Sequence, residues 1–457
     1  MVAFLPSIKD IRATFTRLHA RLGDFWWYSL MLFCACRAAD VLNAFVGLWL
    51  VPKYVTPSEL GAVMPLTQFA NFLAIPVAAF ANTFRNELTR LSINKEFGKL
   101  KTLMRGVFAA TAVFLFVAII VARFTLPLFL ERIRIVEGSL GLVIIAASFV
   151  GAVAPIYSNA LQALKKFKAQ SLLSIVGAPV RLIAMLLAMP FRAITGYFVG
   201  QAATPAFSIA ASVIALRKEL SVKAEPYWTR ETFKKFSALL AIFLTWGIAT
   251  GFYNLVESMI IRQRLPDLDS AGYYIATRFS DIAGFLAATL AFTLFPFIAE
   301  QASKGDDTRP LTIKSITVNG LFCLTLAIPF LLCGRQLISF LPHGNQYAEY
   351  WWAIPWIIGV VWLSSLYGFY SMTETAANRF GFLKWGIPLD MAYPAILLIT
   401  TGHGYFSSFI PDSWTTFLSV HNIYSLKTML SWMTAVNTIK AVFCIVAMSQ
   451  PHHRTRL

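Results

Sequence analysis

The feature that most constrains this chain is a series of apolar runs, each about 20 residues long or longer. A helix needs roughly 20 apolar residues to cross the hydrocarbon core of a bilayer. Of the 457 residues, 57% are hydrophobic and only 13% are charged, a balance that excludes a soluble globular domain. The sequence therefore predicts an all-α polytopic membrane protein with about 12 transmembrane helices, over residues 28–51, 60–83, 106–127, 138–163, 171–190, 194–216, 236–260, 271–297, 314–333, 350–378, 385–402 and 426–449.

Basic residues gather in every second loop between these runs. Residues 85–105, 165–168, 217–235 and 304–314 hold clusters of Lys and Arg, whereas the alternate loops hold one or two each. Because basic loops stay on the cytoplasmic side, the pattern predicts that both termini are cytoplasmic. The net charge of +17 is then explained by these loops rather than by nucleic-acid binding.

The first 27 residues are polar and basic, and they precede an apolar run that is too long for a cleavable signal peptide. Residues 7–24 fit an amphipathic helix on an anionic inner leaflet, although a plain basic tail fits them nearly as well. The five cysteines lie in or at the ends of apolar runs, without the spacing of metal ligands. We therefore expect neither a metal site nor a disulfide framework.

An internal repeat appears when the chain is shifted by 211 residues, which places Gly61 on Gly272. Few residues are identical between the two halves, but their apolar runs and basic loops follow in the same order at this offset. A chance match of hydropathy is the alternative. Because six runs are an even number, both halves enter the membrane from the same side, so the repeat predicts a parallel pseudo-two-fold. The predicted parts are a cytoplasmic N-terminal segment, an N-lobe, a basic inter-lobe linker, a C-lobe and a tail, at 1–27, 28–216, 217–235, 236–449 and 450–457.

Charged residues interrupt two of the runs at the same spacing. Arg37, Asp40 and Asn43 follow one another at intervals of three in the first run, and Arg278 and Asp281 repeat the interval in the eighth. Each set therefore lies on one face of its helix. A charge at the centre of a spanning helix costs about 2.5–3.5 kcal/mol on insertion scales, so it faces protein or water. Each pair either neutralises itself and fixes helix packing or forms one wall of a hydrated cavity.

Arginine suits a phosphate ligand, because its planar fork donates two parallel hydrogen bonds and stays charged in any environment. The sequence therefore favours Arg37 and Arg278 as ligands of an anionic head group in a cavity between the two lobes. Other polar residues of the runs are candidates for lining this cavity or for carrying a coupling ion: Asp40, Asn43, Asn71, Asn254, Glu257, Asp281 and Arg181.

Four further charges lie within or at the ends of the runs. Arg181 either lines the cavity or extends its head to the membrane surface. Lys440 is expected to pair with an acid elsewhere in the fold, and Asp390 to be a satisfied residue of a helix interface. Glu374 fits the lining of the cavity and a gate at its end equally well.

Two stretches carry a resemblance to a known family. Leu48–Gly61, followed by Pro76 and the basic loop 85–105, resembles the oligosaccharide flippases of polysaccharide biosynthesis. These belong to the multidrug/oligosaccharidyl-lipid/polysaccharide (MOP) exporter superfamily. In the second half, Ala271–Arg278 followed by Leu294–Pro296 carries the same resemblance.

The resemblance implies a MATE-like fold of two six-helix lobes around a cationic, V-shaped cavity. It also implies that a polyprenyl-diphosphate-linked oligosaccharide crosses a bacterial cytoplasmic (inner) membrane outward, by alternating access and without a cofactor. In related flippases of lipid-linked precursors, arginines of the first and eighth spans bind the diphosphate, and Arg37 and Arg278 occupy the corresponding places. Partners would be the lipid-linked oligosaccharide, the bilayer and other biosynthetic proteins such as a polymerase.

Two other functions remain open at this stage. A cation-coupled multidrug exporter of the same superfamily would use Asp40, Asp281 or Glu257 to carry a proton or Na⁺. A membrane glycan polymerase or transferase is disfavoured, because acid–base chemistry needs positioned carboxylates or histidines. The longest outer loop, 403–425, offers only His403, Asp412 and His421.

Overall fold

Twelve long helices make up most of the computed structural model, which describes residues 34–135, 140–164, 166–304, 306–377, 379–401 and 425–449. No strand occurs within these ranges. The helices correspond one to one to the predicted runs: Cys34–Tyr54, which ends in α2 (Val51–Tyr54), α3 (Pro57–Ile93), α4 (Phe97–Arg132), α5 (Leu140–Ala163), α6 (Phe167–Ala188), α7 (Ala193–Ala215), α9 (Arg230–Arg264), α10 (Asp267–Lys304), α11 (Arg309–Ser339), α13 (Ala353–Ala376), α14 (Leu383–Thr401) and α16 (Leu426–Ser449).

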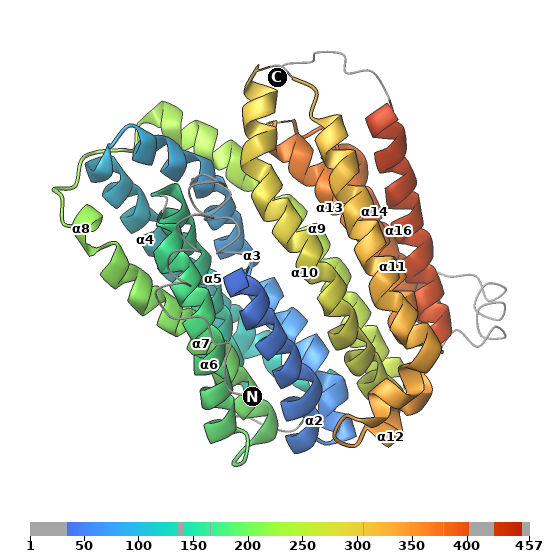
Figure 1. Ribbon diagram of the computed structural model, residues 1–457. Coiled ribbons are helices and arrows are strands. Elements are labelled where there is room, and N and C mark those ends of the chain that lie inside the picture. Colours follow the sequence, from blue (N-terminus) through green and yellow to red (C-terminus); the bar gives the residue numbers. More distant parts are fainter. Residues whose placement is uncertain are drawn as a thin grey trace, which may run out of the picture.

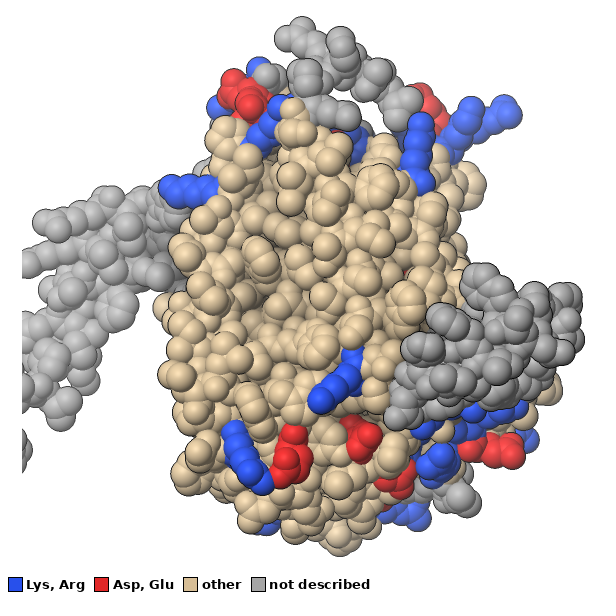
Figure 2. Space-filling view, turned by 90° about the vertical axis from the view of Figure 1, so that its right-hand side faces the viewer, with Lys and Arg blue, Asp and Glu red and all other residues tan. Residues whose placement is uncertain are grey.

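Ten of these helices are long and apolar enough to cross a membrane, and α10 and α14 lie beside them in the bundle. Large apolar side chains face outward along many of them, α4 and α11 above all. Figure 2 shows a broad surface with almost no charged side chains, between two ends that carry most of them. The chain is therefore a multi-pass membrane protein, as the sequence predicts.

The helices form two bundles that lie side by side in Figure 1, blue to green on the left and yellow to red on the right. In the first bundle α5 packs on α3 and α7, and α7 packs on α6. In the second bundle α13 packs on α10, α11 and α16, and α14 packs on α9 and α16. Contacts of α3 with α9 and α10 join the two bundles. We refer to them as the N-lobe and the C-lobe.

The segment between the lobes packs closely against the N-lobe. After the short helix α8 (Arg217–Leu220), the ammonium of Lys101 donates to the carbonyl of Val222 at 2.8 Å, and the Thr102 hydroxyl donates to the carbonyl of Glu225 at 2.6 Å. Phe236, in the second turn of α9, lies in the apolar core of the N-lobe. The first turns of α9 therefore pack with the N-lobe, although the sequence places the start of the C-lobe at residue 236.

A buried arginine joins the lobes at the end of the molecule that the sequence predicts to be outside. Arg262 of α9 is 0% exposed, and it donates to the Ile133 carbonyl at 3.1 Å and to Asp267 at 2.6 Å. Its third bond reaches the hydroxyl of Ser58, at the start of α3, at 3.0 Å. Arg134 also reaches Asp267, at 3.4 Å, from the protein surface. We call these five residues the outer latch.

The outer latch depends on an ionised carboxylate. Burial acts to raise the pKa of Asp267, which precedes the apolar run of α10, but the hydrogen bond with Ser58 and the charges of Arg262 and Arg134 outweigh it. The pKa therefore lies below the usual value of an aspartate. A lowered pKa in the folded state stabilises the fold at neutral pH, and this contribution is lost only as the pH falls through that lowered value.

The amphipathic helix predicted over 7–24, residues 403–424 of the longest predicted outer loop and the tail 450–457 lie outside the described residues.

We expect Arg262→Ala to lower the stability of the purified protein by about 3 kcal/mol, because it removes the three hydrogen bonds of a fully buried charged donor. Arg134→Ala is the matched control: it removes a second cation from the same carboxylate, but its side chain is 55% exposed. Such a surface pair contributes at most about 1 kcal/mol. Thermal unfolding in detergent measures both. Equal melting temperatures for the two variants would contradict the role assigned to Arg262.

Candidate functional site

The first helix lies against α10 across the boundary between the lobes. The Tyr274 hydroxyl of α10 donates to the carbonyl of Gly47 at 3.4 Å. A β-carbon added to Gly47 would lie 3.2 Å from Cδ of Arg278, so the side chain of Arg278 passes directly over this glycine. The missing side chain of Gly47 lets Arg278 approach the first helix this closely. We call this contact region, with the arginines that reach it, the arginine seam.

A local irregularity of the first helix shapes this contact. Residues Val46–Leu50 form a π-helical turn, in which the backbone N–H of Val51 bonds the carbonyl of Val46, five residues back. Pro52 follows, and a proline ring clashes with the carbonyl four residues before it in a regular α-helix. The wider turn relieves this clash, and such π-turns occur often at functional sites.

Both predicted Arg–Asp pairs form. Arg37 contacts Asp40 at 2.9 Å, and Arg278 contacts Asp281 at 3.0 Å. Each arginine also contacts an aromatic ring of α10: the guanidinium carbon of Arg37 lies 5.4 Å from the ring centre of Phe285, and that of Arg278 lies 5.2 Å from Tyr274. The Arg37 contact spans the two lobes. The arginine side chains remain 25% and 28% exposed, so the pairs are not sealed inside one helix bundle.

A third arginine reaches the seam from α6. Arg181 donates to the side-chain oxygen of Asn43 in the first helix at 3.0 Å. It bonds Tyr197 of α7, and its electrostatic neighbours include Tyr274 and Arg278. Of the two alternatives for Arg181, a membrane-surface position is therefore wrong, and its head lies at the seam.

The arginine seam carries a net positive charge. Arg181 has no carboxylate partner within the described ranges, so three guanidinium groups face the two carboxylates of Asp40 and Asp281. The Nε atoms of Arg181 and Arg278 are buried and find no acceptor among the described residues. Buried donors are usually hydrogen-bonded in folded proteins, so these two can donate to an anionic ligand. The seam is thus suited to an anion.

A second cavity, of about 390 Å³, lies among α9, α10, α13, α14 and α16 of the C-lobe, and Met64 of α3 in the N-lobe completes its lining. We call it the C-lobe cavity. Three of the candidate residues line it, namely Asn254, Glu257 and Asp281. The Tyr273 hydroxyl donates to the carboxylate of Glu257. Asp281 also pairs with Arg278, so one residue belongs to the cavity and to the arginine seam.

The cavity also contains a buried ion pair between helices. The ammonium of Lys440 in α16 donates to the carboxylate of Asp390 in α14, and both side chains are more than 90% buried. Lys440 lies 4.8 Å from the ring centre of Tyr253 and 5.7 Å from that of Tyr367. The prediction that Lys440 pairs with an acid is confirmed. The sequence does not identify Asp390 as that acid, because the two residues lie in different runs.

Two other candidates lie elsewhere. Asn71 is exposed on α3 and bonds Gln68 at 3.5 Å. Glu374 pairs with Arg379 at 2.7 Å, beside a pocket of about 10 Å³ that also contains Arg309. Glu374 is not among the residues that line the C-lobe cavity, and both alternatives for it at the predicted inter-lobe cavity stay predictions.

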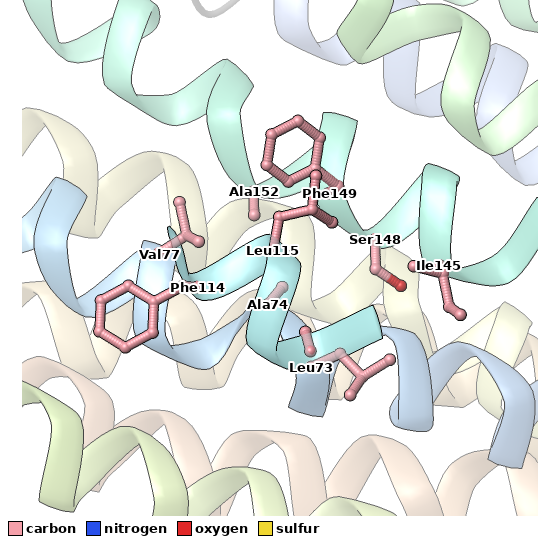
Figure 3. Close-up of a pocket in the computed structure, with 10 residues that line it drawn as sticks. Leu73, Ala74, Val77, Phe114, Leu115, Ile145, Ser148, Phe149 and Ala152 are labelled. Carbon is pink, nitrogen blue, oxygen red and sulfur yellow. The ribbon is translucent and has the colours of Figure 1, made fainter. Parts of the chain in front are cut away.

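The N-lobe has a pocket of its own, shown in Figure 3, between α3, α4 and α5. Its volume of about 20 Å³ has room for a single water at most, and nine of its ten lining residues are apolar. The one hydroxyl, of Ser148, is already bonded to the Ile144 carbonyl at 2.6 Å. This pocket is not a ligand site. No cluster of metal-ligating side chains occurs among the described residues either.

The sequence matches no known family model and no curated protein. Its structure is similar to solved transporters. An inward-facing multidrug resistance MATE transporter of the MOP superfamily is 12% identical, with a TM-score of 0.64 over 92% of this chain and 97% of that one. The lipid II flippase MurJ, in an inward closed conformation, is 12% identical, with a TM-score of 0.60 over 93% and 87%.

A third solved structure is a MOP superfamily transporter from Pyrococcus furiosus, 12% identical, with a TM-score of 0.56 over 93% of this chain and 95% of that one. It is described as having a binding pocket of reversed polarity that suggests a different function. Identities this low show the fold alone. The chain therefore has the MATE-like fold shared by these transporters, as the resemblance in its sequence implies.

We expect Lys440→Met and Asp390→Leu each to destabilise the protein by about 3–5 kcal/mol, because each leaves one buried charge unpaired. The double variant removes both charges and keeps similar volumes, so its stability should return close to that of the parent protein. Melting temperatures in detergent measure this cycle. Additive losses in the double variant would show that the two groups are not a buried ion pair.

Proposed function

We propose that this protein is a flippase that moves a polyprenyl-diphosphate-linked oligosaccharide across the bacterial cytoplasmic membrane. The observation that carries this proposal is the arginine seam, where Arg37, Arg181 and Arg278 lie along the boundary between the lobes, with two carboxylates paired to them among the described residues. The sugar and the diphosphate cross the membrane between the lobes, while the prenyl tail stays in lipid.

The geometry of the seam fits a diphosphate. Asp40 and Asp281 hold Arg37 and Arg278 from their own helices, so the heads are already positioned when an anion arrives. Arg37 contacts the ring of Phe285, which lies seven positions after Arg278 in α10. Seven positions correspond to about 10 Å along a helix. Arg181 adds a charge that no carboxylate of the described residues pairs with. Two neighbouring phosphates can accept bonds from several of these groups at once.

The fold supports transport by alternating access. A multidrug transporter and a lipid II flippase share it, and two lobes joined along few helices can rock about a central site. The outer latch holds the lobes together at the predicted outer end. Release of the substrate outward requires the bonds of Arg262 to break, so the latch sets part of the barrier between the inward-facing and outward-facing states.

The membrane potential is sufficient to give the transport a direction. A diphosphate with a charge of about −2 gains free energy when it leaves an inside-negative compartment. At about 2.3 kcal/mol per charge per 100 mV, the gain approaches 4–5 kcal/mol if no counter-ion travels with it. The proposal therefore does not require a coupling ion.

A second candidate function is a cation-coupled multidrug exporter. The observation that favours it is the C-lobe cavity, where Glu257 lies near the rings of Tyr253 and Tyr273. A carboxylate among aromatic rings suits an organic cation. The arginine seam does not, because its net positive charge repels such a substrate.

We expect Arg37→Ala and Arg278→Ala each to lower flipping by at least tenfold in proteoliposomes that contain a fluorescent prenyl-diphosphate glycan, because each removes a fork that binds the diphosphate. The lysine variants should recover part of the activity, since lysine keeps the charge but loses the fork. Arg335→Ala is the control, because Arg335 pairs with Glu349 on the protein surface.

Wild-type flipping by both alanine variants, at equal protein levels, would contradict the assignment. Efflux of a cationic dye that survives in both variants but is lost in Asp40→Asn would favour the multidrug exporter instead.

We also expect the flipping rate to rise with an imposed inside-negative potential. Potassium gradients with valinomycin set this potential in proteoliposomes that contain neither a Na⁺ nor a pH gradient. If the flipping rate does not change with the potential and rises only when a Na⁺ or pH gradient is imposed, a coupling ion drives the cycle.

A further inference from the structure

We propose that the C-lobe cavity binds the sugar ring that is attached directly to the diphosphate of the substrate. This inference rests on the proposed function and adds a separate recognition site to it. The arginine seam binds the diphosphate of any such substrate, and the cavity recognises the first sugar of the glycan.

The cavity has the size of a small-ligand site. Its volume of about 390 Å³ lies within the range of roughly 300–1,000 Å³ that is usual for such sites. A water occupies about 30 Å³ in the liquid, so the cavity has room for roughly a dozen waters. A single pyranose with its hydroxyl groups is a ligand of this class.

The lining matches the two kinds of surface that a pyranose presents. Its C–H faces pack against aromatic rings, and Trp246 supplies such a ring, whereas Lys440 already lies over the rings of Tyr253 and Tyr367. Its hydroxyls both donate and accept hydrogen bonds. The amide of Asn254 can do both, and the carboxylate of Glu257 accepts.

Asn254 provides the strongest indication that a polar ligand enters. Its side-chain amide lines the cavity and forms no hydrogen bond with any described residue. The other asparagine of the cavity differs, since Asn437 donates to the Met433 carbonyl at 2.8 Å and to the Tyr253 hydroxyl at 3.3 Å. An amide in a membrane helix bundle needs a partner, because none is available in hydrocarbon. In the cavity, water satisfies it in the absence of ligand, and a sugar hydroxyl can replace that water.

The cavity and the arginine seam occupy adjacent faces of α10. Tyr273 and Thr277 line the cavity, whereas Tyr274 and Arg278 contact the first helix. At about 3.6 residues per turn, Asp281 lies between these two faces. Asp281 both lines the cavity and pairs with Arg278, so a diphosphate on Arg278 places its attached sugar at the mouth of the cavity.

The test compares ligands with and without a sugar. Farnesyl diphosphate and four farnesyl-diphosphate monosaccharides (glucose, galactose, N-acetylglucosamine and N-acetylgalactosamine) are titrated into the purified full-length protein by calorimetry. We expect all to bind, and at least one sugar-bearing probe to bind at least tenfold more tightly than farnesyl diphosphate.

Substitutions separate the two sites. Asn254→Leu should remove the tenfold gain and leave the affinity for farnesyl diphosphate unchanged, whereas Arg278→Ala should weaken all five probes. Retained binding of farnesyl diphosphate shows that the leucine variant is folded, and Glu257→Gln is a second cavity variant that should reduce the gain. The matched control is Asn345→Leu, the same change at an exposed residue of α12 (Gly344–Tyr347).

Each result is decisive. If no sugar-bearing probe binds more tightly than farnesyl diphosphate, or if Asn254→Leu keeps the gain, the cavity does not read the sugar, although the proposed function stands. If no probe binds the parent protein, the proposed function fails as well. Binding of tetraphenylphosphonium that is lost in Glu257→Gln, without any sugar-dependent gain, would assign the cavity to a cationic substrate.

Discussion

The cost of an ionised group in hydrocarbon is the constraint on which the interior of this protein depends. Every charge placed within an apolar run must meet a partner or an aqueous space. The local solution is an Arg–Asp pair one turn apart, used by the first helix and by α10. The tertiary solution is the pair of Lys440 with Asp390, which requires α14 and α16 to pack side by side. These requirements fix which helix faces point inward.

The local ion pairs can be predicted from the sequence, whereas the ion pair between helices cannot. Helix number, approximate bounds and both Arg–Asp pairs follow from apolar length and from a spacing of three residues, which are local properties. Contacts between distant runs do not. The bonds of Arg181 to Asn43 and of Arg262 to Ser58 join residues 138 and 204 positions apart, and no pattern in a single sequence specifies them. The C-lobe cavity is invisible for the same reason, although Asn254, Glu257 and Asp281 could each be chosen as polar residues in apolar runs.

Helix α10 connects the separate parts of the proposed mechanism. Its first residue, Asp267, belongs to the outer latch, its middle carries Arg278 and Asp281, and one of its faces lines the C-lobe cavity. A small rotation of α10 therefore alters the latch, the arginine seam and the cavity together. Substrate binding and opening of the outer end are coupled if the diphosphate interacts differently with Arg278 in the two states.

The central claim is that a diphosphate binds between the lobes on the arginine seam. An electron cryo-microscopy structure of the protein with a bound farnesyl-diphosphate monosaccharide tests it most directly. The account predicts density for both phosphates within salt-bridge distance of Arg37 and Arg278, with Arg181 alongside. Density for the diphosphate at the basic loops, with the seam closed and unchanged, would contradict it.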